Sequence, residues 1–231
     1  NFFNHFLGCN QMENKTPLIP MQDFFRNPEK SSFKISPNGE HIAYMKPWKA
    51  RMNVFVMDMN TKKEVRLTSS QERGIYWFAW LNNNRIGYIK DEGGNENMHF
   101  YAVNVDMSNE IDLTPFENVQ ARIIDDLEDD PNNIIMGLNK RNPQIHDPYR
   151  INVNDGKMDM IAENPGNISE WMTDHDGKLR MAITSDGVNT SLLYRDKESD
   201  GFKPILTTDF KVSIAPLFFT FDNKNLYVAS N

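Results

Sequence analysis

The feature that most constrains the fold of this chain is a strand–turn–strand pattern that occurs five times. In the first copy, residues 33–44, Ser-Pro-Asn-Gly separates two apolar segments, and Asn-Gly accepts the positive φ of a tight hairpin. Repeats of this length indicate a modular architecture. The first apolar residue after each turn follows the previous one by 44, 48, 45 and 47 residues; these residues are Ile42, Ile86, Ile134, Leu179 and Leu226.

The rest of each repeat has the same order of strands. Each hairpin precedes an alternating strand and then a short strand, and no window of 11 or more residues has a helical stripe. The pattern predicts an all-β fold, a β-propeller of four four-stranded blades plus part of a fifth. A β-sandwich would not need the same order five times. The alternating strands are expected at 54–58, 100–106, 149–153 and 192–196, and the short ones at 65–68, 111–114, 158–161 and 205–207.

The fifth repeat consists of its hairpin alone, residues 219–230. An unpaired blade edge exposes backbone donors and acceptors, which natural domains avoid. We therefore expect a fragment of a longer protein, in which residues 1–20 are a leader or extension and residues 21–231 a partial propeller domain. The open blade edge predicts self-association.

Composition excludes several classes of protein. The 231 residues carry a net charge of -7, which argues against a nucleic-acid partner. No window approaches 18 apolar residues, which argues against a transmembrane helix. The single cysteine, Cys9, cannot form an intramolecular disulfide, and we expect no metal or other cofactor. Leu-Gly-Cys at 7–9 is similar to the end of a lipoprotein signal, but Asn4 and His5 interrupt the apolar segment before it. We expect a cytoplasmic protein; the alternative is a periplasmic lipoprotein anchored to the membrane through Cys9.

Several linear segments resemble the prolyl oligopeptidase family of serine peptidases, in its bacterial dipeptidyl-aminopeptidase and acylaminoacyl-peptidase-like branch. The resemblance covers residues 17–230. It implies an N-terminal propeller of seven or eight blades that admits short peptides to a C-terminal α/β-hydrolase domain. The chain would then be the substrate-gating propeller portion of a serine exopeptidase, with that hydrolase domain and short peptides as its partners. The segments that carry the resemblance are 17–44, 91–101, 113–122, 137–150 and 162–166.

The hydrolase half of that family is missing from these residues. A nucleophile elbow needs Gly-x-Ser-x-Gly, and no segment matches it. No catalytic residue can therefore be assigned, and the chain by itself is not expected to hydrolyse peptides. One alternative is a stand-alone propeller that binds peptides or proteins, as in the Tol system. A propeller lyase acting on acidic sugars would need a His-rich metal site, and the five His are dispersed.

Two acidic segments have the first appearance of metal loops. Residues 125–130 lack the glycine that a calcium loop needs at its sixth position, and residues 174–177 carry their glycine at the fourth. Both are interpreted as turns between blade strands.

Six residues are candidates for gating the substrate. An arginine at a tunnel mouth can hold a peptide carboxylate with two parallel hydrogen bonds, and an exposed aromatic can stack on a peptide. For the segment around His99, a buried turn network with Asp91 and Glu96 is the structural alternative. Trp48 is expected on an exposed loop between residues 44 and 51. The candidates are Trp48, Glu96, His99, Arg141, His146 and Arg150.

Overall fold

The predicted hairpins all form antiparallel strand pairs in the computed structural model, which describes residues 18–26, 28–91 and 93–231. Four sheets contain four strands each and a fifth contains two. The first two sheets are built by β1 (Ser31–Ile35), β2 (His41–Trp48), β3 (Arg51–Asp58), β4 (Glu64–Arg66), β5 (Trp77–Asn82), β6 (Arg85–Asp91), β7 (Met98–Asn104) and β8 (Ile111–Asp112). The others are built by β9 (Ala121–Asp125), β10 (Asn133–Asn142), β11 (Ile145–Asn152), β12 (Met158–Met160), β13 (Ile168–Thr173), β14 (Leu179–Ser185), β15 (Asn189–Tyr194), β16 (Lys203–Asp209), β17 (Ile214–Phe219) and β18 (Leu226–Ser230).

This arrangement confirms the predicted all-β propeller with four full blades and part of a fifth. The five aligned apolar residues are each the first or second residue of the second strand of their sheet, β2, β6, β10, β14 or β18. Within every sheet, strands that follow one another in the chain are hydrogen-bonded neighbours. The blades are thus antiparallel meanders, as the repeat predicts.

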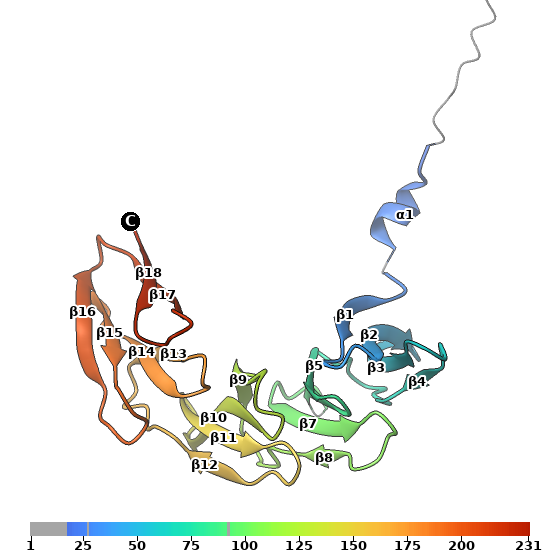
Figure 1. Ribbon diagram of the computed structural model, residues 1–231. Helices are drawn as coiled ribbons and strands as arrows, with labels where there is room; N and C mark the ends of the chain where they lie inside the picture. The colour runs from blue at the N-terminus through green and yellow to red at the C-terminus, as the bar shows by residue number, and fades with distance from the viewer. Residues whose placement is uncertain (1–17, 27, 92) are drawn as a thin grey trace, which may run out of the picture.

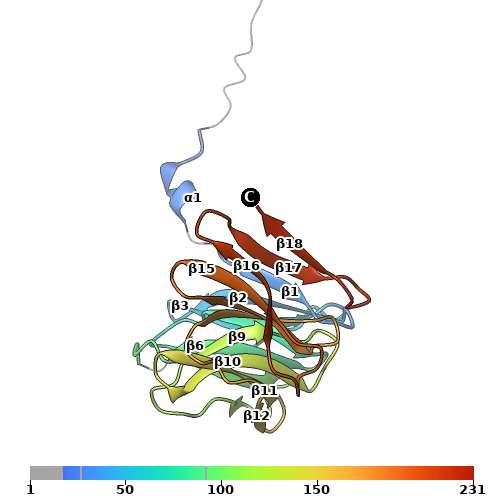
Figure 2. The ribbon, with the colours of Figure 1, turned by 90° about the vertical axis from the view of Figure 1, so that its left-hand side faces the viewer.

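The sheets follow one another round an open arc (Figure 1). The first strand of each sheet, such as β9 or β17, lies on the concave side, and the last strands, such as β8, β12 and β16, lie on the convex side. The view turned by 90° shows the sheets stacked face to face (Figure 2). The described sheets do not close into a ring.

One helix occurs in the described residues, the five-residue α1 (Met21–Phe25), which precedes the first sheet outside the arc (Figure 1). None of its residues is buried. Within the described residues, no helix is both long and apolar enough to span a membrane. Cys9, the predicted lipidation candidate, lies outside the described residues.

Apolar side chains fill the spaces between neighbouring sheets. One buried cluster joins the first sheet to the second, another joins the second to the third, and a smaller one joins the fourth to the fifth. Hydrogen bonds between sheets connect residues about one repeat apart, as when the Trp80 Nε1–H donates to the Lys34 carbonyl at 3.0 Å across 46 residues. The repeat in the sequence is thus also the repeat of the packing.

The placement of Trp48 corrects one expectation. Trp48 was expected on an exposed loop between residues 44 and 51, but it is the last residue of β2 and pairs with Arg51 at the start of β3. The connection is only Lys49 and Ala50, both with positive φ. The alternation of the two strands continues up to this two-residue turn, which leaves no loop to carry the indole.

Large apolar side chains are exposed at the two ends of the arc. They include Phe33 and Ile35 on β1 and, in the fifth sheet, Phe218 and Tyr227. Equivalent positions in the interior sheets face a neighbouring sheet. These end faces therefore lack the cover that the interior sheets give one another.

Candidate functional site

The contact between the third and fourth sheets, which we call the third–fourth junction, differs from the other contacts because polar groups hold it together. Arg150 of β11 donates from Nη1 and Nη2 to the two carboxylate oxygens of Glu198, each at 3.0 Å, and from Nη2 to the Gly177 carbonyl at 2.7 Å. The buried Arg195 donates to the Ile161 carbonyl at 3.2 Å. Two cavities lie at this junction, near opposite ends of β9 and β13.

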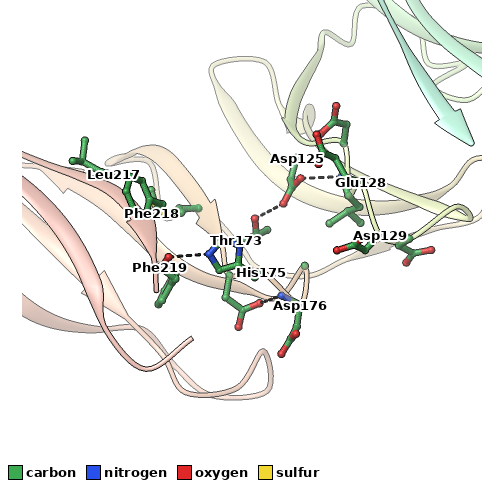
Figure 3. A pocket seen from close by; sticks show the side chains of 15 residues that line it. Asp125, Glu128, Asp129, Thr173, His175, Asp176, Leu217, Phe218 and Phe219 are labelled. Carbon is green, nitrogen blue, oxygen red and sulfur yellow. Dashed lines mark hydrogen bonds between the residues drawn. The ribbon is translucent and has the colours of Figure 1, made fainter. Parts of the chain in front are cut away.

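The first cavity, which we call the acidic cavity, has a volume of about 540 Å³. It lies where the ends of β9, β13 and β17 meet (Figure 3). The two acidic segments that the sequence presented separately, residues 125–130 and 174–177, face each other across it. Residues 217–219 of β17 supply an apolar wall.

Hydrogen bonds fix the walls of the acidic cavity. Asp125 accepts from the Thr173 hydroxyl, which joins β9 to β13, and from the Leu127 amide at 2.9 Å (Figure 3). The His175 Nε2 lies 2.8 Å from the Phe219 carbonyl, and the imidazole stacks on Phe221. These contacts hold the turns of three successive sheets in one arrangement.

Both acidic segments are turns, as predicted. The buried Asp174 accepts from the amides of Asp176 at 3.0 Å and Lys178 at 2.9 Å, and it pairs with Arg180 at 3.1 Å. Among the described residues, no group of three or more His, Cys, Asp or Glu is placed to hold a metal ion. The carboxylates of Glu128, Asp129 and Asp176 are exposed. Together the acidic side chains give the cavity a negative potential that attracts cationic groups.

The second cavity, which we call the His146 cleft, has a volume of about 380 Å³. The residues that line it include Arg122 on β9, Glu170 and Trp171 on β13, His146 and Gly137. Burial first, and then the positive charge of Arg122, lower the pKa of His146 below its usual value. Both effects favour the neutral imidazole.

The structure places the candidates Trp48, Glu96 and His99 in the first two sheets, away from the third–fourth junction. The Trp48 ring is covered by the Arg66 guanidinium at 3.8 Å. His99 Nδ1 contacts an Asp112 carboxylate oxygen at 2.8 Å, so its partner is not the turn network expected with Asp91 and Glu96. The Glu96 side chain is exposed, and its backbone has a positive φ of 63°.

The two candidate arginines already have carboxylate partners. Arg141 donates from Nε and Nη2 to the fully buried Asp147, each at 3.0 Å, and from Nη2 to the Asn164 carbonyl at 2.7 Å. The hydrogen bond to Asp147 raises the pKa of Arg141. Arg150 is engaged with Glu198 as described above. Arg150 joins the third sheet to the fourth, and Arg141 holds β10 to β11 and to the segment before β13. Their roles toward a peptide stay predictions.

Reasoning from the sequence missed Arg122 and Glu170, which the fold brings to one cleft beside His146. They are 48 residues apart, the same separation that joins Arg150 to Glu198 and Asp125 to Thr173. The repeat length therefore indicated that residues at this separation lie close together in neighbouring sheets. It does not show whether two charged side chains one repeat apart face each other or point to different sides of their sheets.

Comparison with curated proteins finds relatives among peptidases. The chain is 30% identical over 223 residues to dipeptidyl aminopeptidase BIII of Pseudoxanthomonas mexicana, which is 92% of this chain and 31% of that protein. It is 24% identical over 221 residues to dipeptidyl peptidase family member 6 of Caenorhabditis elegans, 90% of this chain and 28% of that protein. The chain thus spans about a third of the length of these relatives. No family model matches.

Solved structures share the fold. The propeller domain of the trilobed protease from Pyrococcus furiosus has a TM-score of 0.54 at 15% identity, covering 81% of this chain and 59% of that one. TolB from Acinetobacter baumannii has a TM-score of 0.51 at 13% identity, covering 87% and 54%. Dipeptidyl peptidase 4 of Porphyromonas gingivalis has a TM-score of 0.56 at 11% identity, covering 78% and 33%. At these identities the structures show the propeller fold, and together with the curated relatives they confirm the resemblance to the propeller region of prolyl oligopeptidase family peptidases.

Proposed function

We propose that this chain is the substrate-gating propeller portion of a serine exopeptidase that releases short peptides. The observation that carries the proposal is the match of 92% of the chain to one region of a dipeptidyl aminopeptidase. Because the chain spans about a third of its curated relatives, peptide hydrolysis is proposed for the whole protein and not for these residues. The catalytic groups would come from an α/β-hydrolase domain.

Gating in this proposal is a steric and electrostatic effect. The first strands of the sheets face the concave side of the arc (Figure 1), where an extended peptide would pass and a folded protein would not fit. The acidic cavity would favour peptides with a cationic end at low salt, because exposed charges are screened as the ionic strength rises. The exposed apolar side chains at both ends of the arc support the further proposal that additional sheets cover them in the whole protein.

A second candidate is a stand-alone binding propeller, which the fold of TolB fits as well. This function needs neither a hydrolase domain nor selection by length. It predicts affinity for a peptide or protein partner without turnover. The matches to dipeptidyl peptidases along almost the whole chain favour the first function.

Kinetics of the complete protein, expressed from its full coding sequence, test the proposal. We expect a dipeptide coupled to a chromogenic leaving group to be hydrolysed, and a folded protein with the same two N-terminal residues to be spared. Unfolding that protein substrate by heat separates gating from a preference for particular sequences. If the propeller excludes folded substrates, the unfolded chain should be cleaved, whereas a sequence preference would leave it spared. Equal cleavage of the folded protein and the short substrate would contradict gating, and the absence of peptidase activity from a folded complete protein would favour the binding propeller.

A further inference from the structure

The third–fourth junction divides the arc into two units, each held together by apolar packing. Buried apolar clusters join the first sheet to the second, the second to the third, and the fourth to the fifth. Within the described part of the chain, none of these clusters contains residues of both the third and the fourth sheet. The first three sheets therefore form one apolar unit, and the fourth and fifth sheets form another.

Hydrogen bonds connect the two units. On the concave side the Thr173 hydroxyl of β13 donates to the Asp125 carboxylate of β9. Next to β12, on the convex side, Arg195 donates to the Ile161 carbonyl at 3.2 Å. Arg150 makes the three further bonds described above. Packed units that meet through polar contacts move relative to each other, whereas a large apolar interface holds them fixed, so the third–fourth junction is where the arc can bend.

Asn164 holds the two units together at one end of the junction. It lies between β12 and β13 and is only 4% exposed. Its backbone is bound to the third sheet, because its amide donates to the Asp147 carboxylate at 2.8 Å and its carbonyl accepts from Arg141 at 2.7 Å. Its side chain is bound to the first residue of β13, since Oδ1 accepts from the Ile168 amide at 3.1 Å and Nδ2 donates to the Ile168 carbonyl at 2.9 Å. This buried residue therefore fixes a point about which the second unit can turn.

Arg150 closes the junction at a distance from Asn164. It follows Asp147 by three positions along β11, which is about 10 Å. Its guanidinium reaches across the junction to Glu198 and to the Gly177 carbonyl, which both lie in turns of the fourth sheet. The side chains of Arg150 and Glu198 are 23% and 22% exposed, so water reaches both groups and can replace the partners when they separate.

The two cavities give the units room to move. The acidic cavity and the His146 cleft lie at opposite ends of the junction and have volumes of about 540 and 380 Å³. In a close-packed contact, a small rotation would push side chains into one another. Space at both ends of this contact allows a rotation without such clashes.

We propose that the fourth and fifth sheets turn as one body against the first three, with Asn164 as the pivot and the Arg150–Glu198 pair as the latch. With the latch closed, the arc has the curvature seen in Figure 1. When the latch opens, the acidic cavity widens and the concave side opens with it. Hinges of this kind move whole packed units through changes in a few residues. The hinge is independent of the proposed function; only its use, to adjust the width of the passage for a peptide, rests on that function.

Pulsed electron paramagnetic resonance between spin labels measures the opening in the 231-residue chain, in which Cys9→Ser removes the native thiol. Labels at Lys157 and Lys197, exposed residues in turns of the third and fourth sheets, span the junction. Labels at Met107 and Lys157 span the second and third sheets, which an apolar cluster joins. We expect a minor, longer component in the Lys157–Lys197 distance and a single component in the Met107–Lys157 distance.

Two variants open the latch. Arg150→Met should raise the ratio of the longer to the shorter Lys157–Lys197 component at least about tenfold and leave the Met107–Lys157 distance unchanged. Glu198→Gln removes the ion pair while nearly keeping the shape of the side chain, and it should act in the same direction. Arg122→Met is the matched control, because Arg122 lies on β9 at the same junction and makes no ion pair with a described residue. It should change neither distance.

Circular dichroism establishes which variants are folded. If Arg150→Met is not, Glu198→Gln decides; if neither is, the presence or absence of the longer component in the unmodified chain decides. An unchanged Lys157–Lys197 distance in the folded latch variants would overturn the proposal. Equal broadening for both label pairs would overturn it as well, because the whole arc would then loosen and not one junction. Peptide hydrolysis plays no part in the measurement, so its outcome is separate from that of the proposed function.

Discussion

Replacing Arg150 by methionine tests the interpretation of this arginine as a connection between blades. Arg150 is the centre of the third–fourth junction, where it makes two hydrogen bonds to Glu198 and one to the Gly177 carbonyl. Methionine keeps an unbranched apolar side chain in place of the guanidinium and removes all three bonds. We expect a large loss of stability with no change of fold.

The expected loss of stability follows from the Glu198 carboxylate that the substitution leaves without a cation. The side chains of Arg150 and Glu198 are 23% and 22% exposed, so the pair is mostly shielded from water. Burial alone raises the pKa of Glu198, and the hydrogen bonds from Arg150 and the Leu179 amide outweigh it and lower the pKa. Without Arg150 a largely buried carboxylate loses its cation, which costs about 3 kcal/mol.

Urea unfolding followed by circular dichroism measures the change. Arg122→Met is the matched control, because Arg122 makes no ion pair with a described residue, and it should change the free energy of unfolding by less than about 0.5 kcal/mol. Glu198→Gln and the double variant complete a cycle, in which the two losses should fall short of additivity by about 1 kcal/mol or more. Additive losses, or a loss for Arg150→Met as small as for Arg122→Met, would refute the role of Arg150 in joining the blades.

Two further predictions concern the first two sheets. Gly87→Ala should cost about 2 kcal/mol of unfolding free energy in urea, since the added Cβ would lie 2.5 Å from the Cζ of the buried Phe100; Gly201→Ala, with open space around it, should cost little. The hydrogen bond from Lys46, with others, lowers the pKa of Glu64 to about 2 from its usual 4.5. Its stabilisation is therefore complete above pH 4.5 and is lost as the pH falls toward 2, and Glu64→Gln should flatten the measured stability in that window.

Each of these predictions has a contradicting result. Equal unfolding free energies for the two glycine variants would mean that the packing around Phe100 gives way to the added methyl group. A pH profile for Glu64→Gln that is parallel to that of the original chain between pH 2 and 4.5 would mean that this carboxylate does not stabilise the folded state.

The repeat in the sequence was sufficient to predict the blades. The five aligned residues from Ile42 to Leu226 mark the start of the second strand of every sheet, and the later strands lie within a few residues of their expected positions. This part was predictable because turn chemistry and period-2 alternation are local. Trp48 shows the limit of such reasoning, since the two-residue turn that follows it has no Asn-Gly signal.

The third–fourth junction was not predictable in the same way. The 48-residue separation fixes which positions become neighbours, but side-chain length and direction decide whether Arg150 meets Glu198 or Arg122 stays apart from Glu170. The meeting of two acidic turns in one cavity likewise depends on the curvature of the arc. The cavities depend on the angle between neighbouring sheets, and the sequence of a single repeat does not specify that angle.

The most direct test of the central claim is to read the coding sequence that follows Asn231. The claim that the chain is the propeller portion of a serine peptidase predicts two to four further blade repeats and then a Gly-x-Ser-x-Gly elbow, with Asp and His later in the chain. A stop codon within one or two blade repeats, with no such elbow, would contradict it and leave a propeller that binds peptides without cleaving them.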